Sequence, residues 1–131
     1  MFVNAQSVTA YSAFSVRDSS PLAVTLASLA AEARPGGVLL DWTTTSEIDN
    51  LGFTVLRSTT PDAAPERMTF VPSQAPGSAQ GASYQWQDVK VEDGATYWYW
   101  IEDIDLSGAA TRHGPVRVIY ALRGSQAPLR P

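Results

Sequence analysis

The fold is decided by the stretch Thr96-Tyr97-Trp98-Tyr99-Trp100-Ile101, which follows the turn sequence Val91-Glu92-Asp93-Gly94. A run of aromatic and β-branched residues entered through a glycine turn predicts a β-strand. Successive side chains of a strand point to opposite faces, so the two tyrosines and the isoleucine share one face and the two tryptophans share the other. If the tyrosine face packs into the core, we expect the tryptophans to stand on the outside, where a monomer rarely leaves a large apolar patch uncovered.

Length, charge and cysteine content restrict the classes of protein to consider. The 131 residues fit one domain with a sizeable core. The net charge of −4, with Lys90 as the single lysine and the arginines scattered, argues against a nucleic-acid partner, which needs a basic face. The absence of cysteine excludes disulfides, thiolate metal sites and cysteine nucleophiles. No apolar run approaches the length of a membrane span, and the first residues do not form an intact secretion signal.

Short apolar runs alternate with turn sequences about every ten residues, a pattern typical of an all-β sandwich. The most helix-like segment, residues 22–33, contains β-branched residues and ends in Arg34-Pro35-Gly36-Gly37, so we expect a strand there too. Seven strands are predicted, at residues 24–33, 38–44, 52–57, 68–71, 84–89, 96–103 and 116–122.

The segments outside these strands divide the chain into an N-terminal extension (1–21), the sandwich (22–123) and a linker-like tail (124–131). Residues 7–17 alternate as a strand does, with the apolar side chains of Val8, Ala10, Phe14 and Val16 on one side. Such an extra strand needs a sheet edge to pair with. The edge could belong to the same chain or, by strand donation, to a neighbouring copy; the exposed tryptophans and the tail favour the neighbour, and pairing within the chain stays open.

Three motifs resemble fibronectin type III-like modules of bacterial surface and secreted proteins. Residues 40–58, Leu-Asp-Trp-Thr-Thr-Thr-Ser-Glu-Ile-Asp-Asn-Leu-Gly-Phe-Thr-Val-Leu-Arg-Ser, resemble the region of the second and third strands. The spacing Val91-x-x-Gly94-x-x-Tyr97-x-Tyr99 resembles the tyrosine corner, and residues 102–108 resemble the hairpin that follows. The resemblance covers residues 24–121.

This resemblance implies a seven-stranded fibronectin type III/immunoglobulin-like sandwich, with the extra strand-like segment at its N-terminus. It implies that Trp42 lies in the core and that the Tyr97 hydroxyl hydrogen-bonds to the connection before it. It also implies an extracellular or cell-surface protein with no catalytic residues and no cofactor.

The candidate catalytic residues, the histidine and the paired carboxylates, also have simpler structural roles. His113, the only histidine, lies in Arg112-His113-Gly114-Pro115 without a G-x-S-x-G motif, so we expect an exposed turn residue. The pairs Glu47 with Asp49 and Glu102 with Asp103 could serve as acid and base in a glycosidase. We instead expect Glu47 to accept backbone N–H groups or to pair with an arginine.

The sequence Asp103-Ile-Asp105-Leu-Ser-Gly108 has oxygen ligands at alternate positions, as a calcium loop has. The closing glutamate of such a loop is missing, and Asp-x-x-Gly is also common in hairpins. We therefore expect a turn and no metal ion.

Alternation on the neighbouring strands extends the outward face to five residues, here called the tryptophan face: Leu56, Trp98, Trp100, Arg117 and Ile119. Arg117 is expected to lie on a tryptophan ring. Three hypotheses remain for this face: it is covered by the chain itself, it contacts a protein, or its two rings stack on a sugar.

The favoured function is a non-catalytic module of a bacterial surface or extracellular assembly, such as a filament or surface layer, whose partners are copies of itself or a larger structure. A polysaccharide-binding module is the alternative.

Overall fold

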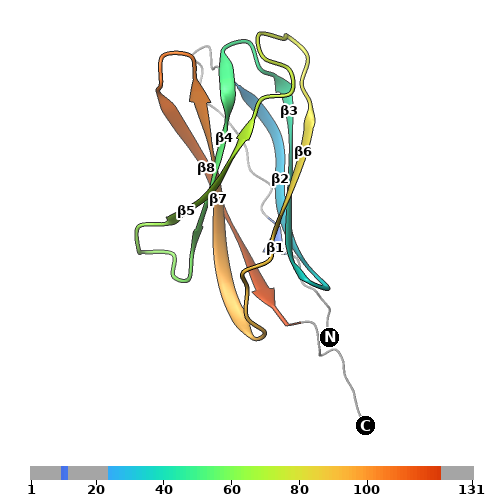
Figure 1. The fold of residues 1–131 in the computed structure, drawn as a ribbon, viewed down its shortest axis with the longest axis vertical. Helices are drawn as coiled ribbons and strands as arrows, with labels where there is room; N and C mark the ends of the chain where they lie inside the picture. Colours follow the sequence, from blue (N-terminus) through green and yellow to red (C-terminus); the bar gives the residue numbers. More distant parts are fainter. Residues whose placement is uncertain (1–9, 12–23, 122–131) are drawn as a thin grey trace.

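The computed structural model describes residues 10–11 and 24–121, and these form strands without any helix (Figure 1). The strands are β1 (Ala10–Tyr11), β2 (Thr25–Arg34), β3 (Gly37–Ser46), β4 (Asn50–Ser58), β5 (Glu66–Pro72), β6 (Ser83–Asp88), β7 (Ala95–Asp105) and β8 (Ala110–Tyr120). Because β1 has only two residues, seven full strands build the domain. The predicted all-β, seven-stranded sandwich is confirmed.

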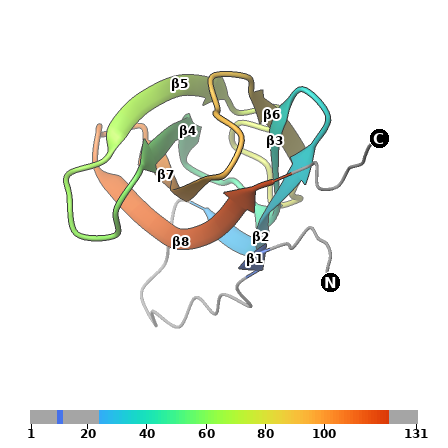
Figure 2. The ribbon, with the colours of Figure 1, turned by 90° about the horizontal axis from the view of Figure 1, so that it is seen from below.

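The strands form two antiparallel sheets, ordered β1-β2-β3-β6 and β5-β4-β7-β8. Seen along the strands, the two sheets face each other around a common interior (Figure 2). The hairpins β2–β3, β4–β5 and β7–β8 stay within one sheet, whereas the connections after β3, β5 and β6 cross to the other. This arrangement gathers the β3–β4, β5–β6 and β7–β8 loops at one end of the sandwich, here called the loop end, at the top of Figure 1.

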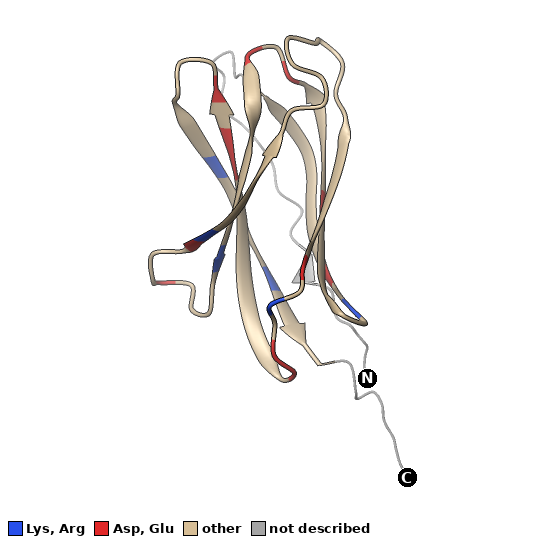
Figure 3. Cartoon of the chain, viewed as in Figure 1, with Lys and Arg blue, Asp and Glu red and all other residues tan. Residues whose placement is uncertain are grey.

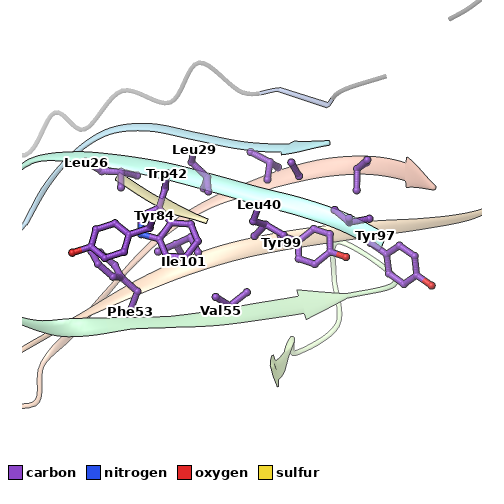
Figure 4. Close-up of a cluster of buried hydrophobic side chains, with 14 of the residues drawn as sticks. Leu26, Leu29, Leu40, Trp42, Phe53, Val55, Tyr84, Tyr97, Tyr99 and Ile101 are labelled. Carbon is purple, nitrogen blue, oxygen red and sulfur yellow. The ribbon is translucent and has the colours of Figure 1, made fainter. Parts of the chain in front are cut away.

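Alternate residues of both sheets fill the interior with apolar side chains (Figure 4). Trp42 is fully buried, as predicted, and stacks on Tyr84 with ring centroids 5.5 Å apart. The edge of Phe53 meets the same indole at 5.6 Å. These three rings come from β3, β6 and β4, so they join the two sheets through one aromatic cluster.

The predicted tyrosine corner is present at the entrance to β7. The backbone N–H of Glu92 donates a hydrogen bond to the Tyr97 hydroxyl at 2.8 Å. Gly94 supplies the positive φ of 87° that the turn requires, a conformation that costs glycine little. The Gly94 N–H then donates to the carbonyl of Tyr120 at 2.6 Å, which ties this connection to the end of β8.

Part of the predicted extra strand pairs within the chain. Ala10 lies opposite Ala31 and Tyr11 opposite Ala30, so β1 extends the sheet beyond β2. This is the arrangement that the intrachain alternative requires. Val8, Phe14 and Val16, the other apolar residues proposed for strand donation, lie outside the described residues, as do most of residues 1–21 and all of the tail 124–131.

Candidate interaction surface

The two faces of β7 separate as the alternation predicted. Tyr97, Tyr99 and Ile101 are buried between the sheets, and Trp98 and Trp100 point to the opposite, outer face. The expectation that both tryptophans are exposed is nevertheless wrong. Trp98 is half-buried, and Trp100 is only 7% exposed although it lies outside the core cluster.

Trp100 is covered by its neighbours in the sheet. Leu56 of β4 lies directly opposite it and is itself 6% exposed. On the other side, the pairing of β7 with β8 shifts register between Tyr99 and Ile101. There, Gly114 has a φ of 115°, and a Cβ placed on it would lie 2.9 Å from the Tyr99 carbonyl oxygen and 3.4 Å from Trp100 Cδ1. The β8 backbone therefore approaches the indole closely, which only glycine permits.

The remainder of the tryptophan face is accessible. Arg117 of β8 lies directly opposite Trp98 and is exposed, and Ile119 follows on the same strand at 41% exposure. The expected stacking of Arg117 on a tryptophan is not among the contacts of the described residues. A cation–π contact forms instead between Arg57 and the inward-facing Tyr97, with 5.0 Å from Cζ to the ring centroid.

A second apolar surface lies at the loop end, where the sequence suggested only polar loops. This loop-end patch comprises Ile48, Leu51, Phe70 and Leu106, which are 58%, 47%, 40% and 64% exposed. The Leu106 N–H donates to the Asp49 carbonyl at 3.2 Å, so the β7–β8 and β3–β4 loops touch. The Phe70 ring lies over Gly52, where a Cβ would come within 2.5 Å of it.

Glu47 is the centre of a buried hydrogen-bond network beside the loop end. Its carboxylate accepts bonds from the hydroxyls of Thr44 (2.6 Å) and Tyr84 (2.8 Å) and from the Asn50 amide (3.0 Å). Ser73 donates a further bond at 2.5 Å. The predicted donors, backbone N–H groups or an arginine, were wrong. Burial alone would raise the pKa of Glu47, but the bonds from Ser73, Thr44, Asn50 and Tyr84 outweigh it and hold that pKa below its usual value.

Arg57 and Asp88 form a second buried network toward the opposite end. Their Nη1 and Oδ2 atoms lie 2.9 Å apart, and the Tyr99 hydroxyl donates to the same Oδ2 at 2.7 Å. Burial, followed by the Asp88 carboxylate, raises the pKa of Tyr99, so this phenol remains a donor. The Lys90 N–H donates to Asp88 Oδ1 at 3.0 Å. Every one of these bonds fixes the connection between β6 and β7.

His113 is not the exposed turn residue that the sequence suggested. It lies in β8 with its side chain between the sheets, and its Nε2 is 2.6 Å from Asp103 Oδ2. Asp103 is equally buried, whereas Glu102 points to the outer face and pairs with Arg112 at 3.1 Å. The two carboxylates of that sequence pair therefore lie on opposite faces of the sheet and do not face a common substrate.

Asp105 closes the β7–β8 hairpin, as the turn hypothesis predicted. Its carboxylate accepts the N–H groups of Ser107 and Ala109, each at 2.9 Å, and the Ser107 hydroxyl at 2.6 Å. The hydroxyl bond from Ser107 makes the largest contribution to lowering the pKa of Asp105. Within residues 10–11 and 24–121, no three His, Asp or Glu side chains are grouped as metal ligands.

The other sheet has a shallow hollow on its outer face, lined by residues of β3 and β6: Asp41, Trp42, Thr43, Ser83, Tyr84 and Gln85. Burial and then the charge of Glu32 raise the pKa of Asp41. Although Trp42 and Tyr84 line the hollow, both rings are buried in the core. The hollow therefore offers hydroxyl, amide and carboxyl groups without an exposed ring.

The chain was compared with protein-family models and with curated proteins, and neither comparison gives a match. No helix that could cross a bilayer occurs in the described part of the chain. The tryptophan face and the loop-end patch are therefore the candidate contact surfaces of this chain.

Proposed function

We propose that this chain is a non-catalytic structural module that makes protein contacts in a bacterial cell-surface or extracellular assembly, such as a filament or a surface layer. The observation that carries the proposal is the tryptophan face. Trp98 is partly open beside the exposed Arg117 and Ile119, and the buried Leu56 and Trp100 lie next to them on the same face of the sheet. Trp and Arg are the residues most enriched among the anchors of protein interfaces.

The use of the buried polar groups supports a structural role. Glu47, Asp88 and the His113–Asp103 pair are the groups with the chemistry of an active site. Each lies inside the sandwich and makes hydrogen bonds that connect strands or loops. A general acid or base must instead come within hydrogen-bond reach of a substrate.

We also propose that the sandwich is a fibronectin type III-like module. Two observations support this: the tyrosine corner at Tyr97, and the strand order in which β2-β3-β6 faces β5-β4-β7-β8. The family proposal is consistent with a role at the cell surface.

The burial of Trp100 weakens the carbohydrate-binding alternative. Stacking on a sugar needs open ring faces, and Trp100 is 7% exposed. The hollow beside Asp41 has polar groups for a sugar but no exposed ring. Protein contact is therefore the better-supported use of this face.

The mass of the native particle tests the proposal. We expect the full chain to form particles larger than its 14.1 kDa monomer in sedimentation velocity, and Trp98→Ser with Arg117→Glu to shift them toward the monomer. Val89→Ser is the matched control, because Val89 is 67% exposed on the β6–β7 connection, away from this face. A wild-type monomer that binds a polysaccharide, and loses that binding with Trp98→Ser, would overturn the proposal in favour of the alternative.

A further inference from the structure

The loop-end patch presents exposed aliphatic groups within an acidic rim. Ile48 and Leu106 project from loops and Leu51 from the start of β4, and each costs free energy by exposure to water unless something covers it. The charged residues of the three loops at this end are acidic: Glu47, which is used internally, and Asp49, with Asp105 at the base of the β7–β8 loop. Figure 3 shows these acidic residues there and no Lys or Arg in the three loops. A ligand for this patch should therefore be apolar and basic.

The chain carries a segment of that chemistry at its other end. Residues 122–131, Leu-Arg-Gly-Ser-Gln-Ala-Pro-Leu-Arg-Pro, contain two arginines, two leucines and no acidic residue. Proline restricts the backbone to extended conformations, so a segment with Pro128 and Pro131 loses less conformational entropy on binding than a flexible one. The segment leaves the sandwich after Tyr120, beside the Gly94 turn and opposite the loop end.

Chain length disfavours contact between this segment and the patch of its own sandwich. Leu129 follows Tyr120 by nine residues, which span at most about 32 Å when fully extended. β8 runs from Ala110 to Tyr120, roughly 34 Å at 3.4 Å per residue, and Leu106 lies beyond Ala110 in the loop. Leu129 could therefore approach Leu106 of its own chain only if every residue between Tyr120 and Leu129 were fully extended along the sandwich, whereas a second copy stacked end to end brings the two together without that constraint.

We propose that the loop-end patch of one copy binds residues 122–131 of the next copy. Leu129 covers the aliphatic groups around Leu106, and Arg123 and Arg130 face the acidic rim formed by Asp49 and Asp105. The contact joins unlike surfaces, so it propagates into an open filament unless the rotation closes a ring. This inference rests on the proposed assembly function. It identifies the partner as a second copy of the chain and the contact surface as one separate from the tryptophan face.

Two full-length variants test the contact by complementation. Leu106→Asp damages only the patch, and Arg123→Glu with Arg130→Glu damages only the tail. Each alone should lose the end-to-end contact and form smaller particles than wild type under the same conditions, whatever association the tryptophan face supports. An equimolar mixture should form larger particles than either variant alone, because one variant keeps a working tail and the other a working patch, so one end-to-end contact can form between them. The wild-type particles should also dissociate as salt is raised, since the arginine contacts are screened.

Controls separate this contact from a folding defect and from the proposed function. Ile48→Asp damages the same patch from another loop and should match Leu106→Asp, and both should melt like wild type because these side chains are exposed. Val89→Ser should assemble normally.

The inference is overturned if wild type remains monomeric, if either variant assembles like wild type, or if the mixture gives no larger particles than the two variants alone. If the patch and tail variants assemble normally while Trp98→Ser with Arg117→Glu does not, the inference fails and the proposed function stands. If instead Trp98→Ser with Arg117→Glu assembles normally while the patch and tail variants do not, the tryptophan face is not the contact surface and the end-to-end contact is supported.

Discussion

Arg57 of β4 and Asp88 of β6 join the two sheets through an ion pair in which Nη1 and Oδ2 lie 2.9 Å apart. The pair lies at the end of β6, where the chain crosses to β7. Asp88 is buried and also accepts the Tyr99 hydroxyl and the Lys90 N–H. The same Nη1 of Arg57 also donates to the Lys90 carbonyl at 2.7 Å, and the guanidinium lies over the face of Tyr97. This pair fixes the connection that leads into the tyrosine corner, and hence the position of β7.

Removal of the Asp88 carboxylate should be severely destabilising. Asp88→Ala leaves the Arg57 charge and the Tyr99 hydroxyl without their acceptor, a loss of about 3–5 kcal/mol for a broken buried pair. Glu66→Ala is the matched control, because the exposed Glu66 lies 3.5 Å from the same guanidinium and should contribute less than about 1 kcal/mol. Urea unfolding of the two variants measures both values. Equal effects of the two substitutions would contradict the assigned importance of Asp88.

Glu47→Gln should lower stability at neutral pH more than at acidic pH. The amide cannot accept all the bonds that the carboxylate receives from Thr44, Tyr84, Asn50 and Ser73, so we expect a loss of about 1–3 kcal/mol at pH 7. The pKa of Glu47 is lowered in the folded protein, so its contribution is complete above the unfolded pKa of about 4.3 and is lost as pH falls through the folded pKa. The difference between wild type and variant should therefore shrink below about pH 4.3. A difference independent of pH would show that the carboxylate's charge is not what the network requires.

Trp42 should be the most costly aromatic residue to remove. Its side chain is fully buried and contacts the rings of Tyr84 and Phe53, so Trp42→Ala leaves a cavity that costs about 3–5 kcal/mol. Domains of this size have only about 5–15 kcal/mol of stability, so the variant could be largely unfolded at 37 °C. Thermal melting followed by circular dichroism gives the answer. A melting temperature within a few degrees of wild type would refute the core assignment.

The parts of this fold that follow from local chemistry were predictable from the sequence. Alternation predicted that Tyr97 and Tyr99 share one face, and the resemblance of Val91-x-x-Gly94-x-x-Tyr97 to fibronectin type III-like modules implied the tyrosine corner. The burial of His113 was not predictable in this way, because it depends on the β7–β8 register that puts His113 opposite Ile101 and diagonal to Asp103. The loop-end patch depends in turn on the β3–β4 and β7–β8 loops, which are distant in sequence, meeting beside β4 and β5 at one end.

The burial of Trp100 was likewise not predictable from the sequence alone. Gly114-Pro115, just before the apolar run of residues 116–122, is a recognisable sign of a turn or an irregular strand. The sequence does not reveal, however, that this irregularity lies against Trp100, because that contact is set by the register of two strands.

The two tryptophans should therefore respond differently to the same substitution. Trp100→Ser removes a side chain that packs beside Leu56 and the Gly114 backbone, and we expect a loss of about 3 kcal/mol in the free energy of unfolding. Trp98→Ser removes a half-buried ring beside the exposed Arg117, so it should cost less than about 1 kcal/mol while it weakens association. Urea unfolding and sedimentation velocity on each single variant separate the two effects. If Trp98→Ser lowers the free energy of unfolding as much as Trp100→Ser does, Trp98 is needed for folding. Only Arg117 and Ile119 of the tryptophan face are then available to contact a partner.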